Sequence, residues 1–174
     1  MADQERTGGV TFRGNPLTLA GPALKPGDKA PDFQCLAQDL SPVTLASSAG
    51  KARLLIAVPS LDTPVCSLET VRFNREVAGM GGNRQVYVIS MDLPFAQKRF
   101  CGSENIGNIE SLSDHRDASF GRAYGVLIKE LRLLARALFV VDPGDTIRYV
   151  QLVREVTQEP NYDEALNALR TAAG

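Results

Sequence analysis

The chain has 174 residues, enough to bury a core of its own, and we expect one domain over residues 1–174. Its 19 basic and 20 acidic side chains leave a net charge of -1, so overall charge favours neither nucleic acid nor an anionic membrane as a partner. The first residues are polar, and no run approaches the length of a membrane span. We therefore expect a soluble, cytoplasmic protein.

The first part of the chain predicts a β-hairpin and then a connection. Apolar and polar residues alternate in residues 10–21 around the turn signal Gly14-Asn15-Pro16, and we expect this hairpin to form an added lid or edge. Residues 21–31 are rich in proline, glycine and charge, which predicts a connection. A short strand at residues 33–36 contains Cys35, which we place in the core because free cysteine is among the most buried residue types.

A strand, a helix and a second strand form the centre of the expected fold. After a possible short strand at residues 43–45, the run at residues 53–58 is typical of a parallel strand buried on both faces. The helical pattern that begins after Thr63 stops at residues 79–82, and residues 85–91 form the next buried strand. Such an order predicts a right-handed crossover with parallel strands, in which ligands bind beyond the carboxyl ends of the strands.

Cys66 falls in the first turn of this helix. Thr63 is a favoured N-cap residue, and Pro64 suits the next position because the N–H that proline lacks has no helical partner there. Unpaired backbone N–H groups and the helix dipole then favour a thiolate at the sulfur. A helix terminus lowers a thiol pKa by only about one unit, so a fully formed thiolate needs a second cation or donor, such as an arginine. From position alone, Cys66 could equally be a buried structural thiol.

The next residues predict a short helix at 94–101 that ends at Gly102 and carries Cys101 in its last turn. A weak strand at 109–113 and a short helix at 118–124 follow. His115, the single histidine, lies between them in an expected surface loop. It cannot complete a zinc site with distant cysteines, so we assign it a structural or solvated role and expect no metal site. The three cysteines are an odd number and too few for a disulfide scaffold, so a disulfide here would be catalytic rather than structural.

The C-terminal part predicts an antiparallel hairpin and a helix. Residues 133–141 form a strand, residues 142–145 a turn and residues 146–153 the returning strand. Arg136 interrupts the apolar run, and taken alone it could face solvent or belong to a buried ion pair. An amphipathic helix at residues 161–170 should cover one face of the sheet.

Two motifs resemble a known family. The spacing P-x-x-x-T-x-x-C from Pro59 to Cys66 resembles the active-site signature of the peroxiredoxins, which are thiol-dependent peroxidases of the thioredoxin superfamily. Residues 91–101, MDLPFAQKRFC, resemble the second-cysteine segment of the Tpx-type thiol peroxidases, in which both cysteines belong to one chain. Residues 10–19 and 134–137 also resemble that group, so the resemblance covers nearly the whole chain.

The resemblance implies an α/β, thioredoxin-like fold with an added N-terminal β-hairpin. It implies that Cys66 is the peroxidatic cysteine, which reduces hydrogen peroxide or an organic hydroperoxide, and that Cys101 is the resolving cysteine, which forms an intramolecular disulfide with Cys66. Arg136 and Thr63 would hydrogen-bond the peroxide and the thiolate, and Pro59 would shield the sulfenic acid. The resemblance further implies thioredoxin as reductant, a homodimer and no cofactor.

Other interpretations stay open. Cys101 could be a packing residue, and with both helices intact and apart its disulfide with Cys66 would require one helix end to unwind. A thioredoxin-type oxidoreductase needs C-x-x-C, which the chain lacks. A cysteine hydrolase needs a histidine base, and His115 is the single histidine. A redox sensor or binding partner switched by the same disulfide is the non-enzymatic alternative, which would lack rapid turnover.

Overall fold

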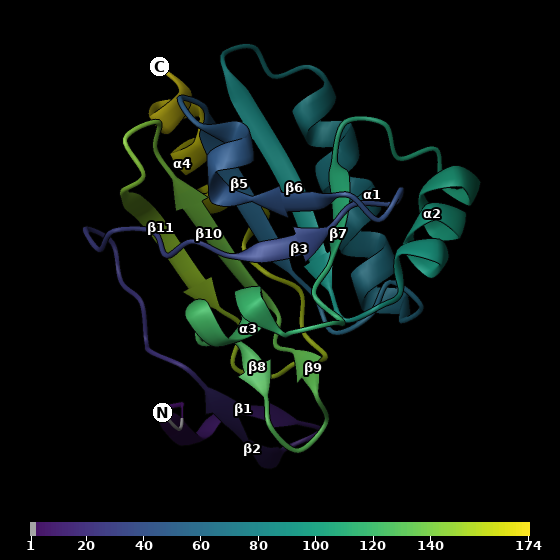
Figure 1. Cartoon of the computed structure of the whole chain (residues 1–174), viewed down its shortest axis with the longest axis vertical. Coiled ribbons are helices and arrows are strands. Elements are labelled where there is room, and N and C mark those ends of the chain that lie inside the picture. The colour runs from purple at the N-terminus through teal and green to yellow at the C-terminus, as the bar shows by residue number, and fades with distance from the viewer. Residues whose placement is uncertain (1–2) are drawn as a thin grey trace.

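The computed structural model describes residues 3–174, which form a central sheet, a smaller sheet and four α-helices (Figure 1). The first two residues of the expected 1–174 domain lie outside the described residues, and the assignment of a single domain stays a prediction. Most elements begin and end within two residues of the bounds that the sequence predicts. Where the structure differs, the difference concerns the small sheet and the strand that contains Arg136.

The central sheet has seven strands in the order β11-β10-β5-β6-β7-β3-β4. Its middle strands β5, β6 and β7 are parallel, as expected for a crossover, and antiparallel strands flank them on both sides. The strands are β3 (Gln34–Leu36), β4 (Pro42–Thr44), β5 (Ala52–Ala57), β6 (Arg84–Ser90), β7 (Glu110–Ser113), β10 (Ala137–Val141) and β11 (Ile147–Leu152).

Helices cover both faces of this sheet, because β5 is apolar on both sides. On one face, Leu54 and Ile56 of β5 share a core with Phe73 of α1 and Leu166 of α4. On the other face, Leu55 belongs to a second core that includes α3 and the smaller sheet. The helices are α1 (Pro64–Ala78), α2 (Pro94–Ser103), α3 (Ser119–Ala123) and α4 (Tyr162–Ala173), with a 3-10 helix η1 (Leu45–Ser48). The predicted burial of the central strand on both faces is confirmed.

The N-terminal hairpin is longer than predicted and belongs to a sheet of its own. Its strands pair with two short strands in the order β1-β2-β8-β9, namely β1 (Glu5–Phe12), β2 (Asn15–Ala20), β8 (Leu127–Ile128) and β9 (Leu133–Leu134). The turn is Arg13-Gly14, where both residues have positive φ (50° and 81°), as a type I′ turn requires. Asn15 and Pro16, which were expected in the turn, pair with Phe12 and Thr11 instead. The hairpin is therefore not an edge of the central sheet.

The single strand predicted at residues 133–141 is wrong in one respect. The structure divides it into β9 of the small sheet and β10 of the central sheet, with Ala135 and Arg136 between them. A continuous apolar run hides this division, because both strands are buried. The consequence is that Arg136 lies where the chain passes from one sheet to the other.

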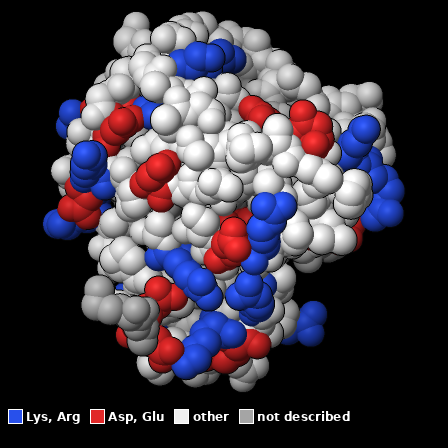
Figure 2. All heavy atoms as spheres, viewed as in Figure 1, with Lys and Arg blue, Asp and Glu red and all other residues white. Residues whose placement is uncertain are grey.

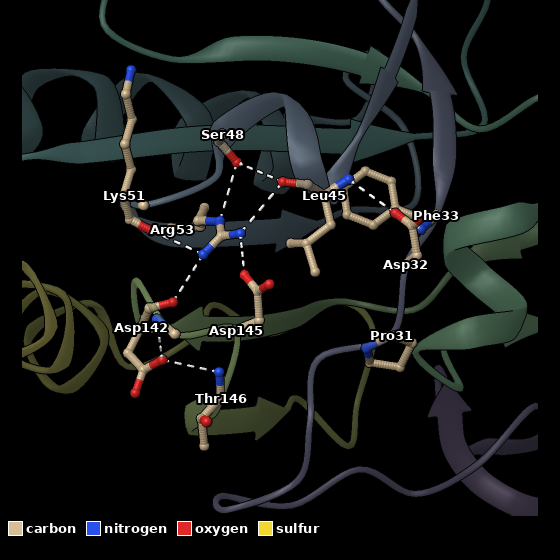
Figure 3. A network of polar contacts seen from close by, with 12 residues as sticks. Pro31, Asp32, Phe33, Leu45, Ser48, Lys51, Arg53, Asp142, Asp145 and Thr146 are labelled. Carbon is tan, nitrogen blue, oxygen red and sulfur yellow. Dashed lines mark hydrogen bonds and ion pairs between the residues drawn. The ribbon is translucent and has the colours of Figure 1, made fainter.

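A buried arginine, Arg53, joins two loops at the amino end of β5. Arg53, near the amino end of β5, is fully buried and donates hydrogen bonds to the Oγ of Ser48 and to the carbonyl oxygens of Lys51 and Asp142 (Figure 3). It also forms an ion pair with Asp145 at 2.5 Å. These contacts join η1 to the turn between β10 and β11, so Arg53 serves the fold at the end of β5 that lies away from Cys66.

The surface carries both signs of charge. Figure 2 shows basic and acidic side chains interspersed on the visible face, many of them around the small sheet at the bottom of the view. Ion pairs such as Lys129–Glu5 and Arg122–Asp3 lie in this region. Among residues 3–174, none of the helices has the length and hydropathy that crossing a membrane would require.

Candidate active site

Cys66 lies where the sequence places it, in the first turn of α1 beyond the carboxyl end of β5. Thr63 is the N-cap in an extended conformation, Pro64 begins the helix, and the backbone N–H of Cys66 donates to Thr63 Oγ1 at 3.4 Å. The Thr63 hydroxyl itself donates to the carbonyl oxygen of Ser60 at 2.9 Å. The predicted helix start is confirmed. Pro59 is buried in the loop that leads from β5 to Thr63.

The structure brings Arg136 to Cys66. Ala137 pairs with Ala57, the last residue of β5, so Arg136 lies at the same end of the sheet as the loop that leads to Cys66. Its Nη2 donates to Cys66 Sγ at 3.4 Å. The side chains of both residues are buried, with 0% of Cys66 and 2% of Arg136 exposed. Burial alone would suit a structural thiol, but contact with a guanidinium provides the second cation that a stable thiolate needs.

Two further groups hold the guanidinium of Arg136 in place. The carbonyl oxygen of Val156 accepts hydrogen bonds from Nε at 3.1 Å and from Nη2 at 2.9 Å. Glu69, one turn after Cys66 on α1, forms an ion pair with Nη1 at 2.5 Å. These contacts and the sulfur engage four of the five guanidinium N–H groups, and one Nη1 hydrogen has no partner in the part of the chain that the structure describes.

The charges of Glu69 and Arg136 act on each other in a buried environment. Burial raises the pKa of Glu69 to about 7, although the positive charge of Arg136 opposes this shift. For Arg136, burial acts to lower the pKa, but the charges of Glu69 and Cys66 outweigh it, and the pKa lies above its ordinary value. Glu69 was not among the site residues predicted from the sequence. Its spacing of three residues from Cys66, which puts both on one helix face, was the available signal.

A second carboxylate missed by the sequence analysis fixes the loop before Thr63. Asp92 follows β6, whose carboxyl end lies at the same edge of the sheet as that of β5. Its carboxylate accepts hydrogen bonds from Ser60 Oγ at 2.7 Å, Leu61 N at 2.8 Å and Ser90 Oγ at 2.7 Å. Ser90 Oγ also accepts from Gln97 Nε2 of α2 at 3.0 Å. The loop that leads to Cys66 and the helix that carries Cys101 are thus joined through one network.

Cys101 is a buried free thiol in the last turn of α2, as predicted, and it is not bonded to Cys66. It lies near Ser111 of β7 and Gln38; burial raises its pKa, and hydrogen bonds with these two residues oppose the shift. Because β7 is two strands away from β5, this location lies on the order of 10 Å across the sheet from the strand that precedes Cys66. The polar partners of Cys101, Ser111 and Gln38, are not those of Cys66, so a disulfide requires one of the two segments to move.

Cys35 and His115 take no part in this cluster. Cys35 is 1% exposed, and its thiol donates to Asp114 Oδ1 at 3.5 Å in the core on the other face of the sheet. Burial raises the pKa of Cys35, which disfavours a thiolate. The expected core position of Cys35 is confirmed. His115 is half-buried in the loop between β7 and α3.

The pairing of a helix-terminal sulfur with a guanidinium suits thiol-based redox chemistry. The Redoxin family model matches residues 25–166. The chain is 54% identical over 163 residues to a thiol peroxidase of Halalkalibacterium halodurans, covering 94% of this chain and 98% of that relative. It therefore belongs to the thiol peroxidases, which are peroxiredoxins of the Redoxin family.

Further comparisons agree with this assignment. A thiol peroxidase of Oceanobacillus iheyensis is 52% identical over 160 residues, covering 92% of this chain and 97% of that relative. The crystal structure of a peroxiredoxin-like protein from Aquifex aeolicus superposes with a TM-score of 0.89 at 48% identity, covering 96% of this chain and 97% of that chain. The expected thioredoxin-like fold is confirmed, and the chain is a thiol-dependent peroxidase.

Proposed function

We propose that the protein reduces hydrogen peroxide and organic hydroperoxides with Cys66 as the peroxidatic cysteine. The observation that carries this proposal is the 3.4 Å contact between Arg136 Nη2 and Cys66 Sγ at the N-terminus of α1. A guanidinium and a helix terminus both favour negative charge at the sulfur. Cys35, in contrast, lies beside the carboxyl group of Asp114, where a thiolate is disfavoured.

In the first step, the thiolate of Cys66 attacks the outer peroxide oxygen. The S–O bond forms as the O–O bond breaks, and the departing oxygen takes a proton from solvent and leaves as water or an alcohol. Arg136 stabilises the charge that moves from sulfur to the leaving oxygen, using the Nη1 hydrogen that has no partner among residues 3–174. Thr63 orients the first turn of α1 through its bonds to Cys66 N and Ser60 O, and Pro59 limits access of solvent to the sulfenic acid.

In the second step, Cys101 attacks the sulfur of the Cys66 sulfenic acid. The S–S bond forms, the S–O bond breaks, and the hydroxide leaves as water after it takes the Cys101 proton. The separation of the two cysteines means that α2 unwinds locally before this step. α2 has no side-chain N-cap hydrogen bond and buries only Pro94, Gln97 and Cys101, so it is the weaker of the two helices. Thioredoxin then reduces the disulfide by thiol exchange.

Turnover with a recycling system tests this mechanism. Peroxide-dependent NADPH oxidation through thioredoxin and its reductase is compared for wild type, Cys66→Ser, Cys101→Ser and the control Cys35→Ser. The proposal predicts loss of turnover in the first two variants and retention in the third. Full turnover by Cys66→Ser would refute it, and a single oxidation without turnover by the wild type would support a redox sensor instead.

A homodimer and a cytoplasmic location stay predictions. Leu93 and Phe95, at the start of α2, are 52% and 65% exposed, and they offer apolar surface to a second copy of the chain. Sedimentation of the reduced protein tests the homodimer: a monomer at micromolar concentration contradicts it.

A further inference from the structure

The position of Arg136 depends on residues 153–158, the first part of the connection between β11 and α4 (Figure 1). The carbonyl oxygen of Val156 in this segment accepts two hydrogen bonds from the guanidinium, through Nε and Nη2. Nη2 also donates to Cys66 Sγ. Because the guanidinium is planar and its N–H directions are fixed, a shift of the Val156 carbonyl rotates the hydrogen that points at the sulfur.

The N-terminal hairpin holds this segment in place. The backbone N–H of Thr11 in β1 donates to the carbonyl oxygen of Arg154 at 2.7 Å, and Val156 N donates to the carbonyl oxygen of Thr11 at 2.9 Å. Residues 153–158 lie outside the strands of both sheets, so these two bonds substitute for a strand ladder. The hairpin therefore contacts the residue whose carbonyl oxygen binds Arg136.

The side chain of Glu155 joins the N-terminal hairpin to residues 153–158. One carboxylate oxygen accepts hydrogen bonds from Gly14 N at 2.8 Å and Thr11 Oγ1 at 3.2 Å. The other accepts from Thr157 N at 2.9 Å and Thr157 Oγ1 at 2.7 Å. Bonds from Thr157, Gly14 and Thr11 lower the pKa of Glu155 to about 2, so the carboxylate is ionised over the working pH range. Four donors from two segments thus converge on one side chain.

We propose that Glu155 is a positioning residue for peroxide reduction, which couples the turn of the N-terminal hairpin to Arg136 through the Val156 carbonyl. This inference rests on the proposed roles of Cys66 and Arg136. Glu155 touches neither the sulfur nor the guanidinium, and acts by fixing the backbone that binds Arg136. The hairpin then has a function in the reaction besides covering the core.

Glu130 provides a matched control. It is an exposed glutamate that also binds the hairpin, because its two carboxylate oxygens accept from Thr18 N of β2 at 3.0 and 2.9 Å. Hydrogen bonds with Thr18 lower its pKa as well. Its contacts lead to β2 and not to the segment of residues 153–158. Loss of Glu130 therefore removes a comparable anchor of the hairpin without touching the support of Arg136.

A double-mutant cycle tests the proposal in the full chain. We expect Glu155→Ala to lower kcat/KM for hydrogen peroxide about tenfold, with Glu155→Gln intermediate and Glu130→Ala unchanged. The kcat/KM for the reductant should stay unchanged in all three. In an Arg136→Lys background, Glu155→Ala should cause no further loss, because both changes affect one contact.

Three results would overturn the proposal: an unchanged kcat/KM in Glu155→Ala, an equal loss in Glu130→Ala, or a second full loss in the Arg136→Lys background. Should Glu155→Ala unfold, Glu155→Gln and Thr11→Val provide the same comparison. An Arg136→Lys variant with full activity would instead refute the role of Arg136 in the proposed function. Failure of that role and failure of the Glu155 inference are therefore distinguishable.

Discussion

Arg136 donates a hydrogen bond to the sulfur of Cys66 at 3.4 Å, although the two residues are 70 positions apart in the chain. The antiparallel pairing of β10 with β5 creates this contact, because Ala137 lies opposite Ala57 at the end of the sheet where the active-site loop begins. The helix terminus supplies one source of positive potential and Arg136 the other. Together they provide what the sequence analysis required of a reactive cysteine.

Replacement of Arg136 by lysine should lower kcat/KM for hydrogen peroxide by about 100-fold. Lysine keeps a positive charge beside Glu69, but it cannot contact Val156 O, Glu69 and Cys66 Sγ at the same time. Steady-state kinetics with the recycling system measures the change. Arg53→Lys is the matched control, because Arg53 is also a buried arginine with several partners, and it should lose stability while kcat/KM stays unchanged. Equal losses in both variants would contradict a specific role for Arg136.

The stability of the protein should depend on pH through Glu69. Burial raises the pKa of Glu69 from 4.5 to about 7 in the folded state, so between these pH values the folded protein binds more protons than the unfolded chain. Stability contributed by this group is therefore present below pH 4.5 and is lost as the pH rises to about 7. The loss is on the order of 1–3 kcal/mol.

Denaturant unfolding of wild type and Glu69→Gln between pH 4.5 and 7.5 measures this contribution. Glutamine cannot titrate, so the variant should lose less stability than wild type as the pH rises from 4.5 to 7.5. Glu76→Gln, elsewhere on α1, controls for the removal of a carboxyl group from the helix. Parallel curves for wild type and Glu69→Gln would contradict the prediction.

Asp92→Asn should destabilise the active-site loop. An amide retains one acceptor oxygen, which can serve Leu61 N and Ser90 Oγ. Its NH₂ group then replaces the oxygen that accepts from Ser60 Oγ, so the Ser60 hydroxyl loses its charged acceptor. We expect a loss of about 1–3 kcal/mol in the free energy of unfolding and a lower kcat/KM for peroxide. Asp28→Asn, which removes a carboxylate that accepts from Lys25 N in a surface turn, should leave the kinetics unchanged. Wild-type kinetics in Asp92→Asn would show that the network does not support the loop.

Amide hydrogen exchange should be faster in α2 than in α1. The N-terminus of α1 has a side-chain cap at Thr63, whereas Leu93 gives α2 none. If α2 unwinds to bring Cys101 to Cys66, its amides should exchange at least about tenfold faster than those of α1 in the reduced protein. Mass-spectrometric exchange of the reduced form makes the comparison. Equal protection of the two helices would mean that α2 does not open more readily than α1.

The part of the site that could be predicted from the sequence depends on interactions between residues close together in the chain. The N-cap Thr63, Pro64 and the terminator at Gly79 act within one helix, so the place of Cys66 follows from neighbouring residues alone. The division of residues 133–141 between two sheets could not be predicted, because both halves are apolar and their sheet partners are distant in the chain. Glu69 was missed because its environment also depends on a residue distant in the chain. A glutamate on a helix is usually exposed, and its burial depends on Arg136, 67 positions away.

Trapping the sulfenic acid identifies the sulfur that peroxide oxidises. The reduced Cys101→Ser variant is treated with one equivalent of hydrogen peroxide in the presence of dimedone, which traps sulfenic acids, and the peptides are mapped by mass spectrometry. We expect a dimedone adduct on Cys66 and none on Cys35, while the wild type forms a Cys66–Cys101 disulfide. An adduct on Cys35, or an unmodified Cys66, would contradict the central claim that the thiol held by Arg136 is the peroxidatic one.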